Sequence, residues 1–187
     1  MAEIDIIRSR VETFSKVLDK LPEVKYVGDP SLREFSIPVK FEEGLKIGKK
    51  LGDVLLQYRK IAGYGRGFAA PQIGINKSVF TTFVNDNVEI FINPKIVNVS
   101  ETLNYYKELC LSSGIFYADV GRPDWVEMEW TDSKNKSQRQ KFDGFLARLY
   151  QHEEKHLRGV LNLDECESKH TGIATFDPLK EQLRNSR

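Results

Sequence analysis

Three residues in the C-terminal third of the sequence have the types and spacing of a metal-dependent hydrolase site. His152, Glu153 and His156 form the pattern H-E-x-x-H in the stretch QHEEKHLRGV. Histidines four positions apart lie on one face of a helix, so both imidazoles can bind the same ion. Glu153 stands beside them and can exchange a proton with water at that ion. The same pattern also arises by chance on charged helices, but the chain has only three histidines and this pattern uses two.

The pattern leaves the third protein ligand open. One known extension, H-E-x-x-H-x-x-G-x-x-H, places a third histidine where this chain has Asn162, a poor ligand for a transition metal. A downstream acid, Glu165 or Glu167, would complete the two-histidine, one-carboxylate site of several peptidases. A thiolate is the chemically best candidate, and the chain offers Cys110 and Cys166. Spacing alone does not choose between the two cysteines.

Length and composition limit the class of protein that carries this pattern. The 187 residues have room for one domain with a sizeable core, and 40% hydrophobic with 29% charged residues indicates a soluble globular chain. A net charge of +1 provides no overall field for nucleic acid or an anionic membrane. Two cysteines do not form a disulfide framework, and the N-terminus resembles neither a signal nor a transit peptide. We therefore expect a cytoplasmic protein with no membrane partner and no specific nucleic acid.

A helix must place the two histidines, and strands precede it. Asp143 is a good N-cap for a helix that runs to about Arg158, with Gly159 as its C-terminal stop. β-branched, aromatic or alternating residues predict strands over residues 78–84, 88–99, 124–132 and near Lys141. Because the strands do not alternate with helices, the order predicts an α+β fold with mainly antiparallel pairing.

Two further helices are predicted in the N-terminal third, over residues 3–21 and 42–62. The first has one narrow apolar stripe at steps of three and four, formed by Ile4, Ile7, Val11, Phe14, Leu18 and Leu21. We interpret this stripe as the face that docks on the helix's own domain; a helical dimer contact is the alternative, with a run of under three heptads. Near the other end, Asp177 and Pro178 predict a last short helix.

Three stretches in a fixed order resemble the peptide deformylase family. They are GRGFAAPQIG (Gly65–Gly74), ELCLS (Glu108–Ser112) and QHEEKHLRG (Gln151–Gly159), and together they are far more specific than any one of them. Weaker resemblance in DPSLREFSIPV, FINPKI and RPDWVEMEW extends it to about residues 25–165, most of the chain. By this resemblance the chain is identified as a divergent member of the peptide deformylase family.

The resemblance implies a fold, an activity and a partner. The fold is antiparallel β-sheets packed around a central helix that carries H-E-x-x-H, with an extra N-terminal helix. Residues 25–187 would form the deformylase-like metallohydrolase domain and residues 1–24 an N-terminal helical extension. Enzymes of this family remove the N-formyl group from the initiator methionine of new polypeptides. The expected partner is therefore a formylated peptide or nascent-chain N-terminus, with the ribosome as the place of encounter, and the oligomeric state is open.

The resemblance also implies the roles of the site residues. The metal ligands would be Cys110, His152 and His156, holding one divalent ion, Fe(II), with Zn or Ni as replacements. Glu153 would take a proton from the attacking water and pass it to the leaving amine. The side chain of Gln72 and the backbone N–H of Leu111 would hold the developing oxyanion, where fixed donors stabilise charge in the transition state.

Several expected substrate-binding residues depart from the family pattern. The expected set is Gly65, Arg66, Gly67, Leu109, Phe145, Arg148 and Leu149. The family usually has glycine in place of Leu109 and apolar residues in place of Arg66 and Arg148, and Lys155 replaces an aspartate. An arginine at an apolar pocket must reach solvent, pair with an acid or meet an anionic ligand. We interpret both arginines as reaching outward, with altered substrate choice as the alternative.

Three functions therefore compete with deformylation of formyl-methionine. The first is a deformylase-like amidohydrolase with an altered N-acyl or N-formyl substrate. The second is a catalytically weak metal-binding homologue, although neither Glu153 nor Gln72 is needed merely to hold a metal. The third is a peptidase with an acidic third ligand.

Overall fold

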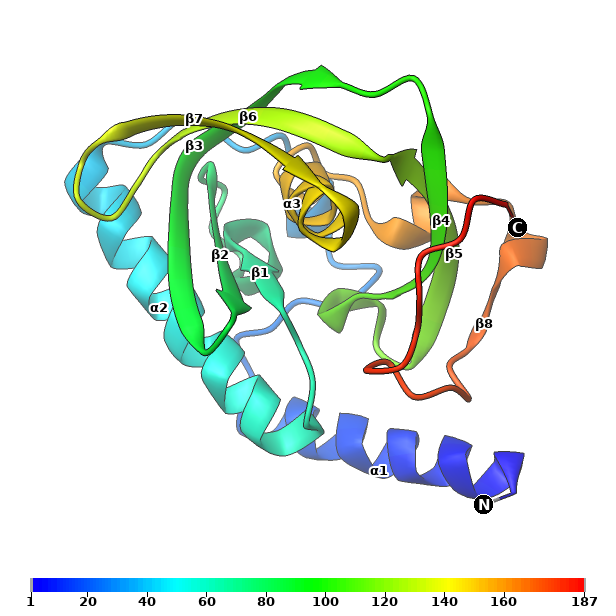
Figure 1. Ribbon diagram of the computed structural model, residues 1–187. Coiled ribbons are helices and arrows are strands. Elements are labelled where there is room, and N and C mark those ends of the chain that lie inside the picture. Colours follow the sequence, from blue (N-terminus) through cyan, green and yellow to red (C-terminus); the bar gives the residue numbers. More distant parts are fainter. Residues whose placement is uncertain (1, 187) are drawn as a thin grey trace.

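The computed structural model describes residues 2–186 and has an α+β fold (Figure 1). Within those residues the α-helices are α1 (Glu3–Lys20), α2 (Phe41–Ala62) and α3 (Gly144–His156). The strands are β1 (Gly67–Ala69), β2 (Val79–Val84), β3 (Asn87–Val99), β4 (Leu103–Leu109), β5 (Phe116–Pro123), β6 (Trp125–Thr131), β7 (Ser137–Asp143) and β8 (Thr171–Ile173). None of the described helices is long and apolar enough to cross a membrane.

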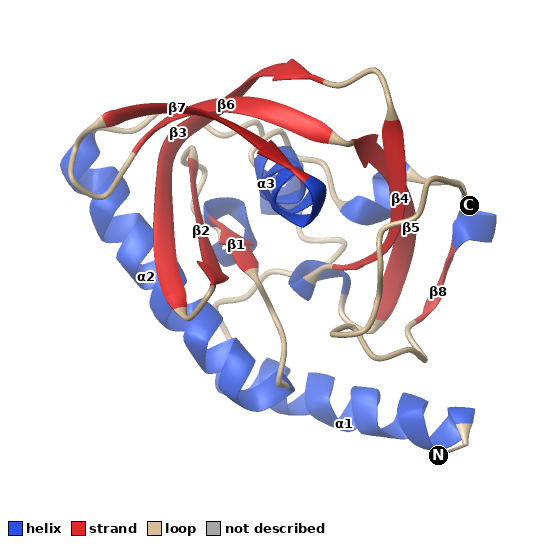
Figure 2. Ribbon diagram, in the orientation of Figure 1, coloured by secondary structure: helices blue, strands red, loops and turns tan. Residues whose placement is uncertain are grey.

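Two antiparallel sheets surround α3, as predicted (Figure 2). The larger sheet has the strand order β1-β2-β3-β6-β7, and the smaller one has the order β4-β5-β8. Helix α2 covers the outer face of the larger sheet, and it approaches closely because Gly48 has no side chain. A Cβ at Gly48 would lie 2.3 Å from Cγ2 of Ile90 on β3. The two sheets together enclose α3, the helix that carries the two histidines.

A cluster of aromatic and apolar side chains holds α3 against the larger sheet. Tyr150 of α3 packs on Phe91 of β3, with ring centroids 4.9 Å apart, and on Phe142 of β7, at 4.6 Å. Phe80 of β2 stacks on the ring of Phe91, with the two ring centroids 4.5 Å apart. Burying each such side chain stabilises the fold by roughly 1.5–3 kcal/mol. This packing fixes the rotation of α3 and so the direction in which its histidines point.

Helix α1 docks on its own domain, as predicted, but on a face that contains only part of the predicted stripe, namely Ile7, Phe14 and Leu21. Val17 and Leu21 are buried in the same core cluster as the apolar residues of α2. The predicted stripe is wrong at Ile4, Val11 and Leu18, which are 52%, 48% and 45% exposed. The packed positions Ile7, Arg10, Phe14, Val17 and Leu21 are also three and four apart, so spacing alone does not decide which of two neighbouring faces of the helix packs.

One other local prediction differs from the structure, and the strands β1, β4, β5 and β8 were not predicted. The Asp177–Pro178 signal forms a single turn and no helix: Asp177 Oδ1 accepts from the N–H of Leu179 at 3.0 Å, and the chain then leads to a bridge with β4. Strand β4 has no apolar alternation because two of its buried positions are the polar Asn104 and Glu108. Sequence periodicity detects a buried strand face only where that face is apolar.

Candidate active site

The two histidines of α3 meet the thiol of Cys110 in the interior. Their Nε2 atoms lie 3.2 Å apart, and Cys110 Sγ lies 3.3 Å from His156 Nε2. The three donor atoms all lie within 4.8 Å of one another. Cys110 follows β4 directly, so the smaller sheet supplies one donor and the central helix supplies two. The fold therefore brings Cys110, the cysteine expected from the family resemblance, to the two imidazoles.

The alternative third ligands have other partners. Glu165 pairs with Arg122, Glu167 pairs with Lys169, Asn162 bonds to Ser113, and the thiol of Cys166 faces the carbonyl of His170. A peptidase site with an acidic third ligand does not form among the described residues. The thiolate–imidazole set is the one whose donor atoms converge.

The hydrogen bonds behind the histidines fit a bound metal ion. His152 Nδ1 lies 2.8 Å from Glu108 Oε2, and His156 Nδ1 lies 3.2 Å from the carbonyl oxygen of Val160. Because both partners are acceptors, each Nδ1 carries the proton and each Nε2 lone pair faces Cys110. Burial raises the pKa of the Cys110 thiol, but the two imidazoles hold it well below its usual range. A thiolate and two imidazole nitrogens are a donor set for a divalent transition metal such as Fe, Zn or Ni.

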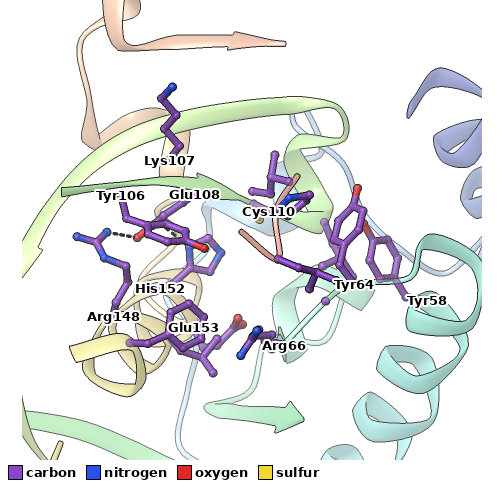
Figure 3. Close-up of a pocket in the computed structure, with 18 of the residues that line it drawn as sticks. Tyr58, Tyr64, Arg66, Tyr106, Lys107, Glu108, Cys110, Arg148, His152 and Glu153 are labelled. Carbon is purple, nitrogen blue, oxygen red and sulfur yellow. Dashed lines mark hydrogen bonds and ion pairs between the residues drawn. The ribbon is translucent and has the colours of Figure 1, made fainter. Parts of the chain in front are cut away.

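Glu108 accepts hydrogen bonds from His152, Arg122 and Arg148, on the side of His152 away from Cys110 (Figure 3). It is 4% exposed and accepts two hydrogen bonds from Arg122, at 2.6 and 2.8 Å, besides the one from His152. Arg148 adds a further bond to Oε1 at 2.5 Å. Burial raises the pKa of Glu108, but the Arg122 guanidinium outweighs it and holds this pKa well below its usual range. The carboxylate is therefore ionised and orients the ring of His152.

The two arginines at the pocket differ in their surroundings. Arg148 is 2% exposed, so its interpretation as an outward-reaching side chain is wrong. Its Nη2 donates to the backbone and side-chain oxygens of Asn104, at 2.7 and 2.6 Å, and its Nη1 donates to Glu108. Arg66 is exposed at the rim and lies over the ring of Phe145, 4.6 Å from its centroid. The guanidinium of Arg148 is thus paired with a carboxylate inside the protein, whereas the guanidinium of Arg66 is exposed to solvent.

Glu153 is buried beside the three donor side chains and aimed into the pocket (Figure 3). It is 3% exposed, and its Oε2 has no hydrogen-bond partner among the described residues. Burial raises the pKa of this carboxyl to about 7. Gly67 of β1 makes room for it, because a Cβ there would lie 2.1 Å from Glu153 Oε1. The glycine expected to admit substrate therefore also admits this carboxyl.

Gln72 presents its amide to the same place. The side chain is 1% exposed, and Oε1 accepts from the N–H of Ala69 at 2.8 Å, which fixes which end of the amide faces inward. Nε2 donates to Ser112 Oγ at 3.0 Å and lies 3.6 Å from Cys110 Sγ. A preorganised N–H donor therefore stands next to the donor atoms.

A pocket opens from these residues to the surface. All the expected substrate-binding residues line it, namely Gly65, Arg66, Gly67, Leu109, Phe145, Arg148 and Leu149. Sequence reasoning missed further lining residues: Tyr58, Tyr64, Tyr106, Lys107, Pro178 and Leu179. They come from α2, the loop after it, β4 and the C-terminal segment, and no local pattern marks them.

The fold and the site define a metal-dependent hydrolase of the H-E-x-x-H class with a cysteine beside the two histidines. A family model described as polypeptide deformylase matches residues 21–171. The chain belongs to the peptide deformylase family and is a hydrolase.

Relatives and solved structures agree with this assignment. A peptide deformylase of Prochlorococcus marinus (strain MIT 9312) is 38% identical over 86% of this chain and 78% of its own length. One of Treponema pallidum (strain Nichols) is 38% identical over 79% and 89%. The crystal structure of a Synechococcus elongatus peptide deformylase in complex with actinonin is 37% identical, with a TM-score of 0.69 over 78% of this chain and 79% of that one. A probable peptide deformylase from Synechococcus phage S-SSM7 is 31% identical, with a TM-score of 0.70 over 76% and 98%.

Proposed function

We propose that this protein removes the N-formyl group from the N-terminal methionine of nascent polypeptides. The observation that carries the proposal is the convergence of Cys110, His152 and His156 beside the buried carboxyl of Glu153. A metal-binding scaffold needs the first three side chains only. The fourth, with an oxygen left unpartnered at the pocket, supports a hydrolytic reaction. The substrate is a new chain as it leaves the ribosome, and the cytoplasm, where both cysteines stay free thiols, is the place of action.

The metal we propose is Fe(II), with Zn or Ni able to replace it, held by Cys110, His152 and His156. When bound, such an ion supplies a Lewis acid toward water and the formyl oxygen. Glu108 keeps the His152 ring in the required orientation, and the backbone carbonyl of Val160 does the same for His156.

The other site residues move the proton and hold the charge. Glu153 takes the proton from the attacking water and gives it to the amine that leaves. The Gln72 amide and the backbone N–H of Leu111 donate to the formyl oxygen as it becomes negative. The bond between Gln72 Oε1 and Ala69 keeps the N–H end of the amide turned inward, so no reorganisation is needed during the reaction.

The surroundings of Arg148 favour an uncharged side chain on the substrate. A free guanidinium in the pocket would select an acidic residue, but this one is paired with Glu108 and Asn104. The aliphatic stem of Arg148 and the side chains of Leu109, Phe145 and Leu149 leave apolar surface for methionine. Deformylation of formyl-methionine is thus better supported than hydrolysis of an acidic N-acyl substrate.

A deformylation assay tests the proposal directly. The protein, purified without oxygen and loaded with Fe(II), is given a formyl-methionyl peptide, and Glu153→Ala serves as the blank. We expect turnover that disappears in the blank while the metal content stays the same. Full metal loading without turnover on any formyl-methionyl peptide would reject the proposed substrate and favour another N-acyl group or a non-catalytic role.

A further inference from the structure

The chain beyond β8 returns to the pocket. This tail segment, residues 176–184, approaches the centre of the molecule and then runs along β4 (Figure 1). Pro178 and Leu179 line the pocket, and Leu179 is 60% exposed. The segment lies beyond residue 171, where the match to the family model ends. An exposed apolar side chain at the mouth of a binding pocket is available for contact with a ligand.

The tail segment is attached at both of its ends. The N–H of Arg184 donates to the carbonyl of Tyr105 at 2.9 Å, and the N–H of Tyr105 donates back at 2.7 Å. The Arg184 side chain also donates to Asp119 Oδ1 of β5 at 2.8 Å. At the other end, Arg10 of α1 donates to the carbonyl of Phe176 at 2.5 Å. Helix α1 therefore holds the tail segment two residues before Pro178, which lines the pocket.

The bridge to Tyr105 occupies the outer edge of β4. In the smaller sheet β4 is an edge strand, with β5 on its other side. Backbone groups of alternate residues in a strand point to the same side, so those of Lys107 and Leu109 face the edge that Arg184 occupies at Tyr105. Lys107 and Leu109 line the pocket. An extended peptide can add to such an edge as a further strand.

We propose that the tail segment ends the substrate groove and sets how many residues of a formylated peptide bind in extended form. This inference rests on the proposed function. A peptide with its formyl group at Cys110 can pair along β4 with Leu109 and Lys107, and then meets Arg184 at Tyr105. The distance from Leu109 to Tyr105 is about 13 Å at the usual rise of a strand, so about three or four substrate residues fit. Later residues must turn away past Leu179 into solvent.

A series of formyl-methionyl peptides of two, three, four, six and eight residues tests this. For the unaltered protein we expect kcat/KM to rise up to three or four residues and to stay level beyond them. In Arg184→Pro the proline has no N–H to donate to Tyr105 and no guanidinium to donate to Asp119, so the attachment of the tail segment to the edge of β4 is loosened at that point. We expect kcat/KM of the octapeptide to rise about two- to tenfold, the worth of one or two hydrogen bonds, while that of the dipeptide is unchanged.

A matched control lies in the same segment. Lys180 is 84% exposed by its side chain and does not line the pocket, so Lys180→Ala is expected to keep the unaltered length profile. If Arg184→Pro does not fold, as judged by thermal unfolding, Asp119→Asn loosens the same attachment from β5. An unchanged length profile in the folded variant would overturn the proposal.

The outcomes also separate this inference from the proposed function. Hydrolysis of formyl-methionyl peptides with a profile that Arg184→Pro and Asp119→Asn leave unchanged overturns the role of the tail segment only. A fully metal-loaded protein that hydrolyses none of these peptides overturns the proposed function and this inference together.

Discussion

The layer behind the proposed metal ligands and the rim of the pocket are built differently. Behind the ligands, Glu108, Arg122 and Arg148 are 4%, 2% and 2% exposed, and each has two or more polar partners in the protein. At the rim, Arg66 is exposed over an aromatic ring, and Leu179 stands 60% exposed in a segment attached at its ends. The buried layer is a closed network, whereas the rim is open to solvent and to ligand.

This difference shows that the effect of a charged side chain at the pocket depends on the partner it meets in the folded protein, which the sequence pattern does not reveal. Arg66 and Arg148 both line the pocket. Arg148 pairs with Glu108 and Asn104 within the protein, so its effect is on stability and on the orientation of His152. Arg66 has its charge at the surface, so its effect is on what approaches the pocket.

The largest effect is expected at Glu153, which lies beside the proposed metal ligands between the buried layer and the rim. Replacing Glu153 by alanine removes the proton carrier and should lower kcat/KM by about 10²–10⁴-fold, the usual contribution of general acid–base catalysis. The metal content should be unchanged, because the three ligand side chains remain. Cys110→Ser is the matched variant and should lose the metal itself. Measurement of metal content beside activity distinguishes the two; retained activity in Glu153→Ala would refute the assigned role.

The next largest effect is expected in the buried layer. Glu108→Ala leaves two guanidinium groups without their shared acceptor, and removing one partner of a buried ion pair costs about 3–5 kcal/mol of folding stability. Loss of the hydrogen bond to His152 should also weaken metal affinity by about 10–100-fold. Urea unfolding and metal competition measure these two effects. If Glu108→Ala were as stable as the original protein, the two arginines would not depend on Glu108 as their buried partner.

Arg148→Leu sharpens the comparison because it alters the buried layer at the pocket itself. Glu108 keeps Arg122 and His152, but Asn104 loses its donors, so we expect a loss of about 1–3 kcal/mol in unfolding free energy. The preference for formyl-methionyl over formyl-glutamyl peptides should be unchanged. A variant that newly gains or loses activity on the acidic peptide would show that the guanidinium faces the substrate.

The smallest effect is expected at the rim. Arg66→Leu removes an exposed charge, so the unfolding free energy should change by no more than about 0.5 kcal/mol. Any change in activity should appear in KM, since Arg66 lies over the ring of Phe145 at the rim and forms no hydrogen bond or ion pair with the metal ligands or Glu153. Thermal unfolding and steady-state kinetics on one formyl-methionyl peptide test this. A loss as large as that of Arg148→Leu would remove the distinction between the two regions.

Local sequence patterns predicted the elements that have regular apolar faces. Helix α2, helix α3 and the strands β2, β3, β6 and β7 follow from periodicity, capping residues and β-branched content. Strand β4 could not be found in this way, because its buried positions are Asn104 and Glu108, which fold inward only where Arg148 and Arg122 receive them. The Asp177–Pro178 signal failed because the bridge to Tyr105 draws the chain along β4 after one turn.

By itself the sequence determined that the two histidines share one helix face with Glu153 beside them, because an i, i+4 spacing depends on helix geometry alone. Motif resemblance then named Cys110. Only the tertiary structure showed the thiol at the imidazoles, forty-six positions from His156, and paired Arg148 with residues of β4. Only the fold brought the tail segment to the pocket and Arg10 of α1 to the tail segment. Such contacts join distant segments, and the packing of whole sheets and helices decides them, since no short stretch carries that information.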